Sequence, residues 1–282
     1  MRVYFNSKRT IPQYLWMAKR YLSLAFKYIP YRLTAYWRKE PDFLIIGVAK
    51  GGTTSLLDYI NQHPDSQVSR EKEVNYFTYH YNRSKFYYRS FFPLKKSNKI
   101  TGEATPYYFV HPEAPSRIKQ DLPKVKLILL LRDPVHRAYS QYNMVKNIDP
   151  AKSFEEAIKL ENERMLEAIT AFKRTKKMDA SHQTFSYVFS GKYYEHLSNW
   201  LKYYKKEDIL ILKSEAFFEN PKETLKRVYG YLGLSEIYPS DLSPKNQRKY
   251  AGLGKDNYIK YKGLFDEDGL QLKKLLGDYF TW

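Results

Sequence analysis

The glycine-rich segment Gly47–Thr54 (GVAKGGTT) contains the residue types that bind an anionic group. Glycines let the main chain come close to an anion, and the N–H groups at the start of a following helix would point towards it. Lys50 is the only lysine of the segment. The segment therefore predicts a binding site for a short anionic group.

The segment differs from the ATP-binding pattern G-x-x-x-x-G-K-[ST]. Gly47 and Gly52 match the pattern, but Thr53 stands where the lysine should be. An ATPase needs that lysine on its β- and γ-phosphates, and it needs a carboxylate for Mg²⁺. Asp133 is the acidic residue after a predicted strand, and its Arg-Asp-Pro context is typical of a salt-bridged turn. These features disfavour a nucleotide kinase or ATPase, which remains an alternative, and predict a site without a metal.

Arg132 and Ser140 form a second candidate anion site. Arg132 follows an apolar run, and Ser140 lies eight residues later, one turn into a predicted helix. A guanidinium offers a fork of donors and a serine offers a hydroxyl, and both suit a phosphate. Two separated phosphate sites around one sheet suit a nucleotide that is phosphorylated at both ends of its ribose.

Three apolar runs predict the strands that position these sites: Phe43–Val48, Val125–Leu131 and Ile209–Leu212. Continuous apolar runs of this length are typical of strands buried in a parallel sheet. A strand, a glycine turn and a helix in succession are typical of the start of a nucleotide-binding α/β domain. We therefore expect a single α/β domain with a central, mostly parallel β-sheet flanked by helices.

Helix-capping residues predict the helices between the strands. The Asn61-Gln62-His63-Pro64-Asp65 cluster ends the helix that follows the glycine-rich segment. Ser153 and Glu156 form a capping box before a helix that runs to about Thr170. Asn220 is an N-cap with Pro221 behind it, before a helix that ends at Gly233.

The chain has a formal net charge of +18, with 48 basic and 30 acidic residues among 282. Such a charge attracts anionic partners, and its spread through the chain favours an anionic substrate over non-specific nucleic-acid binding. A basic nucleic-acid or membrane-binding module is the non-enzymatic alternative. The sequence contains no cysteine, which excludes disulfides and thiolate metal sites. With no apolar run of membrane-spanning length, we expect a cytoplasmic protein.

Residues 1–41 form an N-terminal basic segment with helical character, before the main domain at residues 42–282. Arg9, Arg20 and Lys27 fall near one helical face. We expect this segment to pack on its own domain, and a peripheral contact with a membrane surface is its alternative role.

At these residues the chain resembles the sulfotransferases that use 3'-phosphoadenylyl sulfate (PAPS), in particular the heparan sulfate N- and 3-O-sulfotransferase group. The family's 5'-phosphosulfate loop looks like Lys50-Gly51-Gly52-Thr53-Thr54-Ser55. Its 3'-phosphate motif, R-D-P-x-x-R-x-x-S-x-Y, is met by Arg132, Asp133, Pro134, Arg137, Ser140 and Tyr142. The resemblance extends over residues 42–282 and includes the segments 71–77, 102–109, 199–234 and the closing LLGDYFTW. It implies a P-loop-like fold.

The resemblance also implies roles for particular residues. PAPS would be the donor and adenosine 3',5'-bisphosphate (PAP) the product, without a metal. Lys50 would reach the bridging oxygen of the leaving phosphate, and Glu73 would be the general base. The nucleotide-covering loop would be Arg248-Lys249-Tyr250. The sulfuryl group would pass to a hydroxyl or amine of an anionic or carbohydrate acceptor.

Three positions depart from the heparan enzymes. Asn75 stands where the 3-O-sulfating members have histidine and the N-sulfating members have glutamine. Thr78 replaces a frequent acidic residue, and Ala104 replaces a lysine that lies on the acceptor side in the family. The acceptor is therefore expected to be a glycan other than heparan itself, with a lipid, polyketide or other small hydroxyl compound as the alternative.

Overall fold

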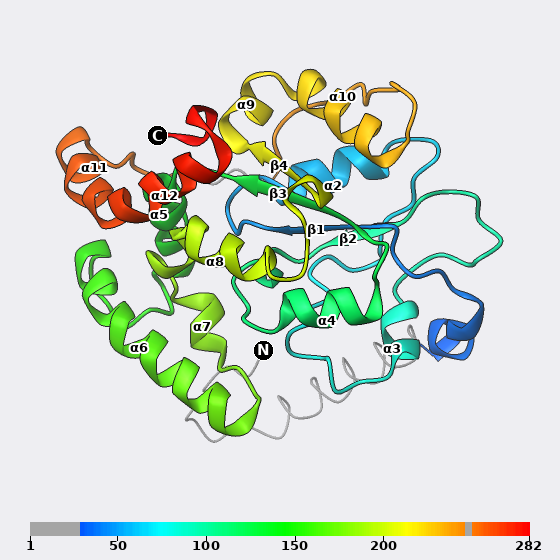
Figure 1. Cartoon of the computed structure of the whole chain (residues 1–282), viewed down its shortest axis with the longest axis horizontal. Helices are drawn as coiled ribbons and strands as arrows, with labels where there is room; N and C mark the ends of the chain where they lie inside the picture. Colours follow the sequence, from blue (N-terminus) through cyan, green and yellow to red (C-terminus); the bar gives the residue numbers. More distant parts are fainter. Residues whose placement is uncertain (1–28, 246–249) are drawn as a thin grey trace, which may run out of the picture.

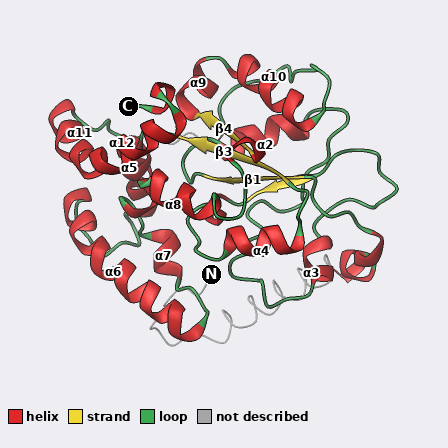
Figure 2. Cartoon of the chain, in the orientation of Figure 1, coloured by secondary structure: helices red, strands yellow, loops and turns green. Residues whose placement is uncertain are grey.

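The predicted apolar runs form three of the four strands of one parallel sheet, in the order β2-β1-β3-β4 (Figure 1). The computed structural model describes residues 29–245 and 250–282. The strands are β1 (Phe43–Gly47), β2 (Gly102–Ala104), β3 (Lys126–Leu131) and β4 (Ile209–Lys213). The expected α/β architecture is confirmed, because helices flank this sheet (Figure 2).

The sheet is buried on both faces, as its apolar runs predict. Alternate residues of each strand point to opposite faces. Leu44 and Leu129 belong to a core that includes Trp200 of α8 (Tyr193–Trp200), whereas Ile45 and Ile128 pack in a second core. That second core includes residues of α2 (Thr53–Asn61), α9 (Ser214–Glu219) and α10 (Pro221–Leu232).

The edge strand β2 was not predicted. It has three residues and contains a carboxylate, Glu103, so it lacks the apolar pattern of a buried strand. Gly102 lies very close to β1, because a Cβ added there would come within 2.5 Å of the main-chain oxygen of Phe43. This close approach requires glycine.

The two helices with predicted N-caps begin where those caps place them. Asn220 caps α10, its Oδ1 accepting a hydrogen bond of 3.3 Å from the N–H of Glu223, and Gly233 ends the helix at a φ of 81°. The expected helix after Ser153 is α6, which extends to Thr175 rather than about Thr170 because Phe172 continues its buried face. The other helices are α3 (Lys85–Arg89), α4 (Ala114–Asp121), α5 (Pro134–Val145), α6 (Phe154–Thr175), α7 (Ala180–Thr184), α11 (Lys255–Lys262) and α12 (Asp266–Leu276).

The segment before the sheet is described from residue 29 onwards. Residues 29–33 are helical and the short helix η1 (Ala35–Trp37) follows. The basic positions Arg9, Arg20 and Lys27 lie outside the described residues, and the division at residue 41 stays a prediction. Within the described ranges, no helix combines the length and the apolar character needed to cross a membrane.

Candidate functional site

The glycine-rich segment forms the predicted turn between β1 and α2. Lys50 and Gly52 both have left-handed φ angles, 70° and 96°. Gly52 is the N-cap of α2, has no side chain to cap the helix, and is followed by Thr53, Thr54 and Ser55. A helix N-terminus with no acidic residue in its first turn carries a partial positive charge and suits an anion.

Arg132 lies directly against this loop. Its Nη1 donates a hydrogen bond of 2.9 Å to the main-chain oxygen of Lys50. Ser214 of α9 holds the next carbonyl, its Oγ donating to the oxygen of Gly51 at 2.8 Å. The side chain of Lys50 extends towards α5, where its Nζ lies 3.8 Å from Sδ of Met144. The structure therefore brings one cation of the second candidate site next to the first site.

The helix α5 carries the rest of the R-D-P-x-x-R-x-x-S-x-Y motif. Ser140 lies about two turns into the helix, rather than one, and its residue is 4% exposed. Arg137 is fully buried; it donates to Oε1 of Gln141 at 2.6 Å and to the carbonyls of Ser186 and Tyr187. Arg137 is therefore a structural residue that fastens α5 to the neighbouring segment. The convergence of Arg132 and Ser140 on one phosphate stays a prediction.

Glu73 and Asn75 lie in a strained loop that precedes β2 in the chain and contacts its last residue, Ala104. Their φ angles are 58° and 55°, and the N–H of Glu73 donates to the oxygen of Ala104 at 3.0 Å. Three of the four non-glycine residues described with such angles are Lys50, Glu73 and Asn75; Lys176, at a helix end, is the fourth. Strained main chain of this kind concentrates at functional sites.

Lys72 connects this loop to the glycine-rich loop, and the sequence analysis missed it. Its Nζ donates to the hydroxyl of Thr54 and lies 3.7 Å from Oε1 of Glu73. Burial lowers the pKa of the Lys72 ammonium, and the Glu73 carboxylate opposes that shift. In the sequence Lys72 is one charge in a charged stretch, so only its position next to Glu73 could have indicated it.

Glu103 is a second residue that was not predicted from the sequence, and it holds the Glu73 loop by a hydrogen bond to its main chain. Its buried carboxylate accepts hydrogen bonds from the hydroxyls of Tyr88, Tyr108 and Thr105, at 2.6–2.9 Å, and from the N–H of Val74 at 3.3 Å. Burial raises the pKa of Glu103, and these donors oppose the shift. The carboxylate therefore fixes the residue that follows Glu73.

Asp133 is the N-cap of α5, a role that was not predicted from its Arg-Asp-Pro context. Its Oδ1 accepts from the N–H of His136 at 2.7 Å, and its Oδ2 accepts from the hydroxyl of Tyr258 at 2.7 Å. Burial alone would raise the pKa of Asp133, but these hydrogen bonds lower it overall. Glu215 links this turn to the chain end by accepting from the N–H of Asp133 and from Nε1 of Trp282.

The expected nucleotide-covering segment is described only at Tyr250. The Tyr250 ring lies edge-on to Tyr139 of α5 at 5.7 Å, and the Tyr139 hydroxyl donates to the oxygen of Ala251 at 3.1 Å. Arg248 and Lys249 lie outside the described residues. Ser55, expected in the donor loop, accepts at Oγ from the N–H of Lys245 at 2.9 Å. Residues just before the covering segment therefore contact the first turn of α2.

Within residues 29–245 and 250–282, no three His, Asp or Glu side chains gather where they could hold a metal ion. The expected independence of a metal remains a prediction.

Comparisons with known proteins point to one family. A model of the sulfotransferase domain matches residues 40–258. Heparan sulfate glucosamine 3-O-sulfotransferase 6 of Mus musculus is 35% identical over 200 residues, which are 71% of this chain and 54% of that protein. The chain thus spans about half the length of this curated relative.

Two solved structures share the fold. A sulfotransferase from Alicyclobacillus acidocaldarius has a TM-score of 0.71 at 24% identity, over 84% of this chain and 96% of that chain. Mouse sulfotransferase SULT7A1 complexed with PAP has a TM-score of 0.52 at 15% identity, over 87% of this chain and 90% of that chain.

The match to the family model includes the glycine-rich loop, the Glu73 segment and the motif that begins at Arg132. It covers far more than half of the chain, and the relative at 35% identity agrees with it. The chain therefore belongs to the sulfotransferase domain family, close to the heparan sulfate 3-O-sulfotransferases.

Proposed function

We propose that this chain transfers a sulfuryl group from PAPS to a hydroxyl or amine of a glycan. The observation that carries the proposal is the cluster at the carboxyl ends of the strands. There Lys72 contacts both Thr54 of the glycine-rich loop and Glu73. This contact supports the proposal, because transfer between a bound donor and an acceptor requires a base close to the anion site.

The chemistry of the donor-side residues fits a nucleotide with phosphate groups. Lys50, Lys72 and Arg132 supply positive charge around the loop, and the N-terminus of α2 adds N–H donors. When bound, PAPS supplies the sulfuryl group and leaves as PAP. SULT7A1, which has the same fold, was solved in complex with PAP.

Glu73 and Lys50 have complementary roles in the proposed reaction. The acceptor oxygen or nitrogen forms a new bond to sulfur while the bond from sulfur to the bridging phosphate oxygen breaks. Glu73 takes the acceptor's proton, and the Lys50 ammonium stabilises the negative charge that develops on the bridging oxygen. The acceptor's proton thus goes to Glu73, the sulfuryl group goes to the acceptor, and the phosphate leaves as part of PAP.

A glycan acceptor is favoured by the relative that is named for heparan sulfate glucosamine. At position 104, however, this chain has alanine where the heparan enzymes have a lysine on the acceptor side. Ala104 is fully buried in the core next to α2, and Asn75 turns its amide back to the oxygen of Glu73 at 2.7 Å. We therefore expect a glycan whose recognition does not depend on a lysine at position 104.

The decisive experiment is transfer of label from [35S]PAPS to a panel of acceptors. The panel holds sulfated and unsulfated glycans, hydroxylated lipids and small hydroxyl compounds, each assayed with and without EDTA. We expect label in a glycan, the release of PAP, and no effect of EDTA. Label only in lipids or small compounds would overturn the glycan assignment, and hydrolysis of ATP without use of PAPS would overturn the donor.

Donor binding has its own test at Arg132. We expect Arg132→Ala to weaken the binding of PAP much more than the binding of adenosine 5'-phosphate, because only PAP carries the 3'-phosphate. Calorimetry with both nucleotides measures the two losses. The matched control is Lys146→Ala, which removes an exposed cation just beyond the end of α5. Equal losses of affinity for both nucleotides would contradict a role in binding the 3'-phosphate. Arg132 would then only support the glycine-rich loop, through its hydrogen bond to the main-chain oxygen of Lys50.

A further inference from the structure

An exposed surface of aromatic, aliphatic and basic side chains lies at the amino ends of the strands, which we call the amino-end patch. Its apolar members have exposed fractions of 43–73%: Ile29, Leu33, Tyr36, Trp37 and Phe86. They come from residues 29–37 and from α3, segments that precede β1 and β2 in the chain. In Figure 1 these segments lie at the opposite end of the sheet from α5.

The fold holds these side chains outwards on a fixed main chain. The N–H of Lys95 donates to the oxygen of Trp37 at 2.7 Å, and Nη1 of Arg38 donates to the oxygen of Phe92 at 2.7 Å. Tyr36 contacts Trp37 and Phe86, with ring centroids 5.9 and 6.5 Å apart. The aromatic rings are therefore exposed although their backbone is hydrogen-bonded to the rest of the domain.

The patch carries a net positive charge, although Lys85 is paired with Asp121 at 2.9 Å. Residues 29–41 contain three basic residues and one acidic residue, Glu40, which is paired with Arg89 at 2.6 Å. Residues 82–99 contain six basic residues and no acidic one. Lys95 lies 5.1 Å from the ring centroid of Tyr36, so cations and aromatic rings are interleaved.

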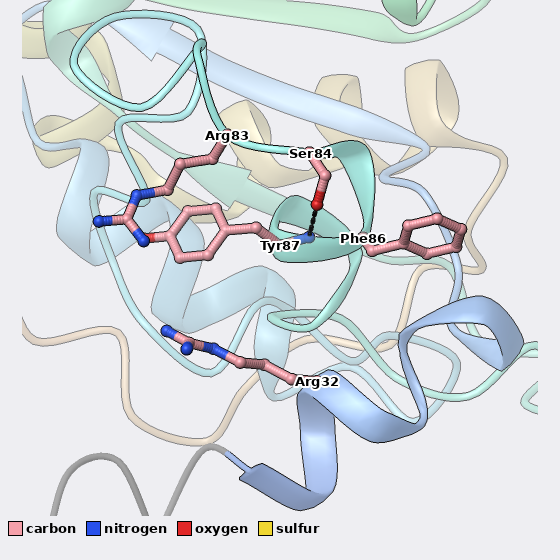
Figure 3. Close-up of a pocket in the computed structure, with 5 residues that line it drawn as sticks. All are labelled: Arg32, Arg83, Ser84, Phe86 and Tyr87. Carbon is pink, nitrogen blue, oxygen red and sulfur yellow. Dashed lines mark hydrogen bonds between the residues drawn. The ribbon is translucent and has the colours of Figure 1, made fainter.

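A cavity of about 340 Å³ opens within the patch, lined by Arg32, Arg83, Ser84, Phe86 and Tyr87. Figure 3 shows the two arginines on opposite sides of the Tyr87 ring, with Phe86 directed away from them. Their Cζ atoms lie 5.8 and 4.7 Å from the ring centroid. Two guanidinium groups beside one opening suit a phosphate group.

We propose that the amino-end patch docks on the surface of an anionic phospholipid bilayer. Trp and Tyr favour the membrane–water interface, and Lys and Arg near the surface are attracted to anionic lipids. Exposed Leu33 and Ile29 add apolar side chains that a purely electrostatic contact with nucleic acid would not use. The cavity that Arg32 and Arg83 line would receive a lipid phosphate.

Charge complementarity argues against the chain's own first residues as the occupant. Residues 1–28 contain six Lys and Arg and no Asp or Glu, so they repel a basic surface. The same composition would strengthen binding to an anionic membrane. With the patch on the bilayer, the carboxyl ends of the strands, where Lys50 and Glu73 lie, would face away from the lipid.

The test is binding of the full chain to vesicles of phosphatidylcholine alone and of phosphatidylcholine with phosphatidylglycerol. We expect binding to the anionic vesicles only, at physiological salt. The triple variant Arg32→Gln/Arg83→Gln/Lys95→Gln should weaken that binding at least tenfold, and Leu33→Ser/Trp37→Ser should do the same. Brominated lipids should quench the fluorescence of the wild type more than that of Trp37→Phe.

Matched controls lie on α6, where Leu166 is 69% exposed and Lys173, Arg174 and Lys177 near its end are also exposed. Leu166→Ser and Lys173→Gln/Arg174→Gln/Lys177→Gln should bind vesicles like the wild type. Equal losses of vesicle binding in both sets of variants would show that only net charge matters, and would contradict the amino-end patch as the docking surface. Absence of vesicle binding, or patch variants that lose only binding to RNA or to heparin fragments, would overturn the lipid assignment.

Discussion

At the scale of single residues, the site combines the glycine-rich loop and the Glu73 loop, both of which are strained and both of which Lys72 contacts. Lys50 and Glu73 have left-handed φ angles, and each such angle costs on the order of 1–3 kcal/mol. Lys72 links the loops through Thr54 and Glu73. The strain is concentrated where the proposed base and the proposed anion site meet.

Glu73→Gln tests the proposed base. The amide keeps the shape of the side chain but does not take a proton, so we expect kcat to fall about 100-fold or more while PAP affinity is retained. Steady-state kinetics and calorimetry on the folded variant measure the two quantities. Glu71→Gln, two residues away in the same segment, is the control and should stay within about twofold of the wild type. Near wild-type turnover in Glu73→Gln would remove this residue from the mechanism.

Glu103→Gln tests a positioning residue. An amide would place N–H donors against hydroxyl and N–H donors, so the Glu73 loop should lose its support. We expect a loss of about 1–3 kcal/mol of stability and a drop in kcat larger than any change in KM.

The control for that prediction is Glu161→Gln. Glu161 is also a buried glutamate, and it accepts from the N–H groups of Val188 and Phe189 at 2.8 Å, on a different part of the domain. It should lose a similar amount of stability and keep its kcat. An equal fall of kcat in both variants would assign Glu103 a purely structural role.

At the scale of elements, caps and close packing decide where helices begin and end. Asn220, Pro221 and Gly233 bound α10 as the sequence predicts, and this helix packs on the sheet face formed with α2 and α9. The cap acts locally, so its removal should weaken the fold without changing the reaction.

Asn220→Ala removes the side chain that accepts the N–H of Glu223. We expect a loss of about 1 kcal/mol and a melting temperature lower by about 2–4 °C. Calorimetric melting checks the shift, and kcat of the folded variant should be unchanged. Asn220→Asp preserves the accepting oxygen and should restore most of the loss; a failure to restore it would show that the cap is not the cause.

At the scale of the whole molecule, buried ionisable groups make the stability depend on pH. Burial lowers the pKa of His111 to about 3 and those of His182 and His196 to about 4. Burial raises the pKa of Glu161 to about 7. These groups act in opposite directions between pH 4.5 and 6.5.

The sign of the dependence follows from the protons bound. In this window the unfolded chain holds three histidine protons that the folded chain lacks, and the folded chain holds one glutamate proton that the unfolded chain lacks. From these four groups, stability should therefore rise with pH by about 2.7 kcal/mol per unit. Urea unfolding from pH 4.5 to 6.5 measures the slope. Glu161→Gln removes the opposing proton and should steepen the slope; an unchanged slope would contradict the assignment.

The sequence by itself determined most of the fold. Continuous apolar runs specify buried parallel strands, and the caps at Ser153 and Asn220 specify helix starts, because both signals are local. The glycine-rich loop and the R-D-P turn were found for the same reason. The edge strand β2 was missed, because three residues around a buried glutamate carry no pattern of their own.

Only the tertiary structure decided which charged side chains meet. Arg132 lies against Lys50 across 82 residues, and Glu103 reaches Val74 across 29. Arg137, which matches the family's 3'-phosphate motif, is buried and donates to main-chain carbonyls. Residue type limits the chemistry of a side chain, but its partners depend on where the strands and loops place it, and that is set by packing across the whole domain.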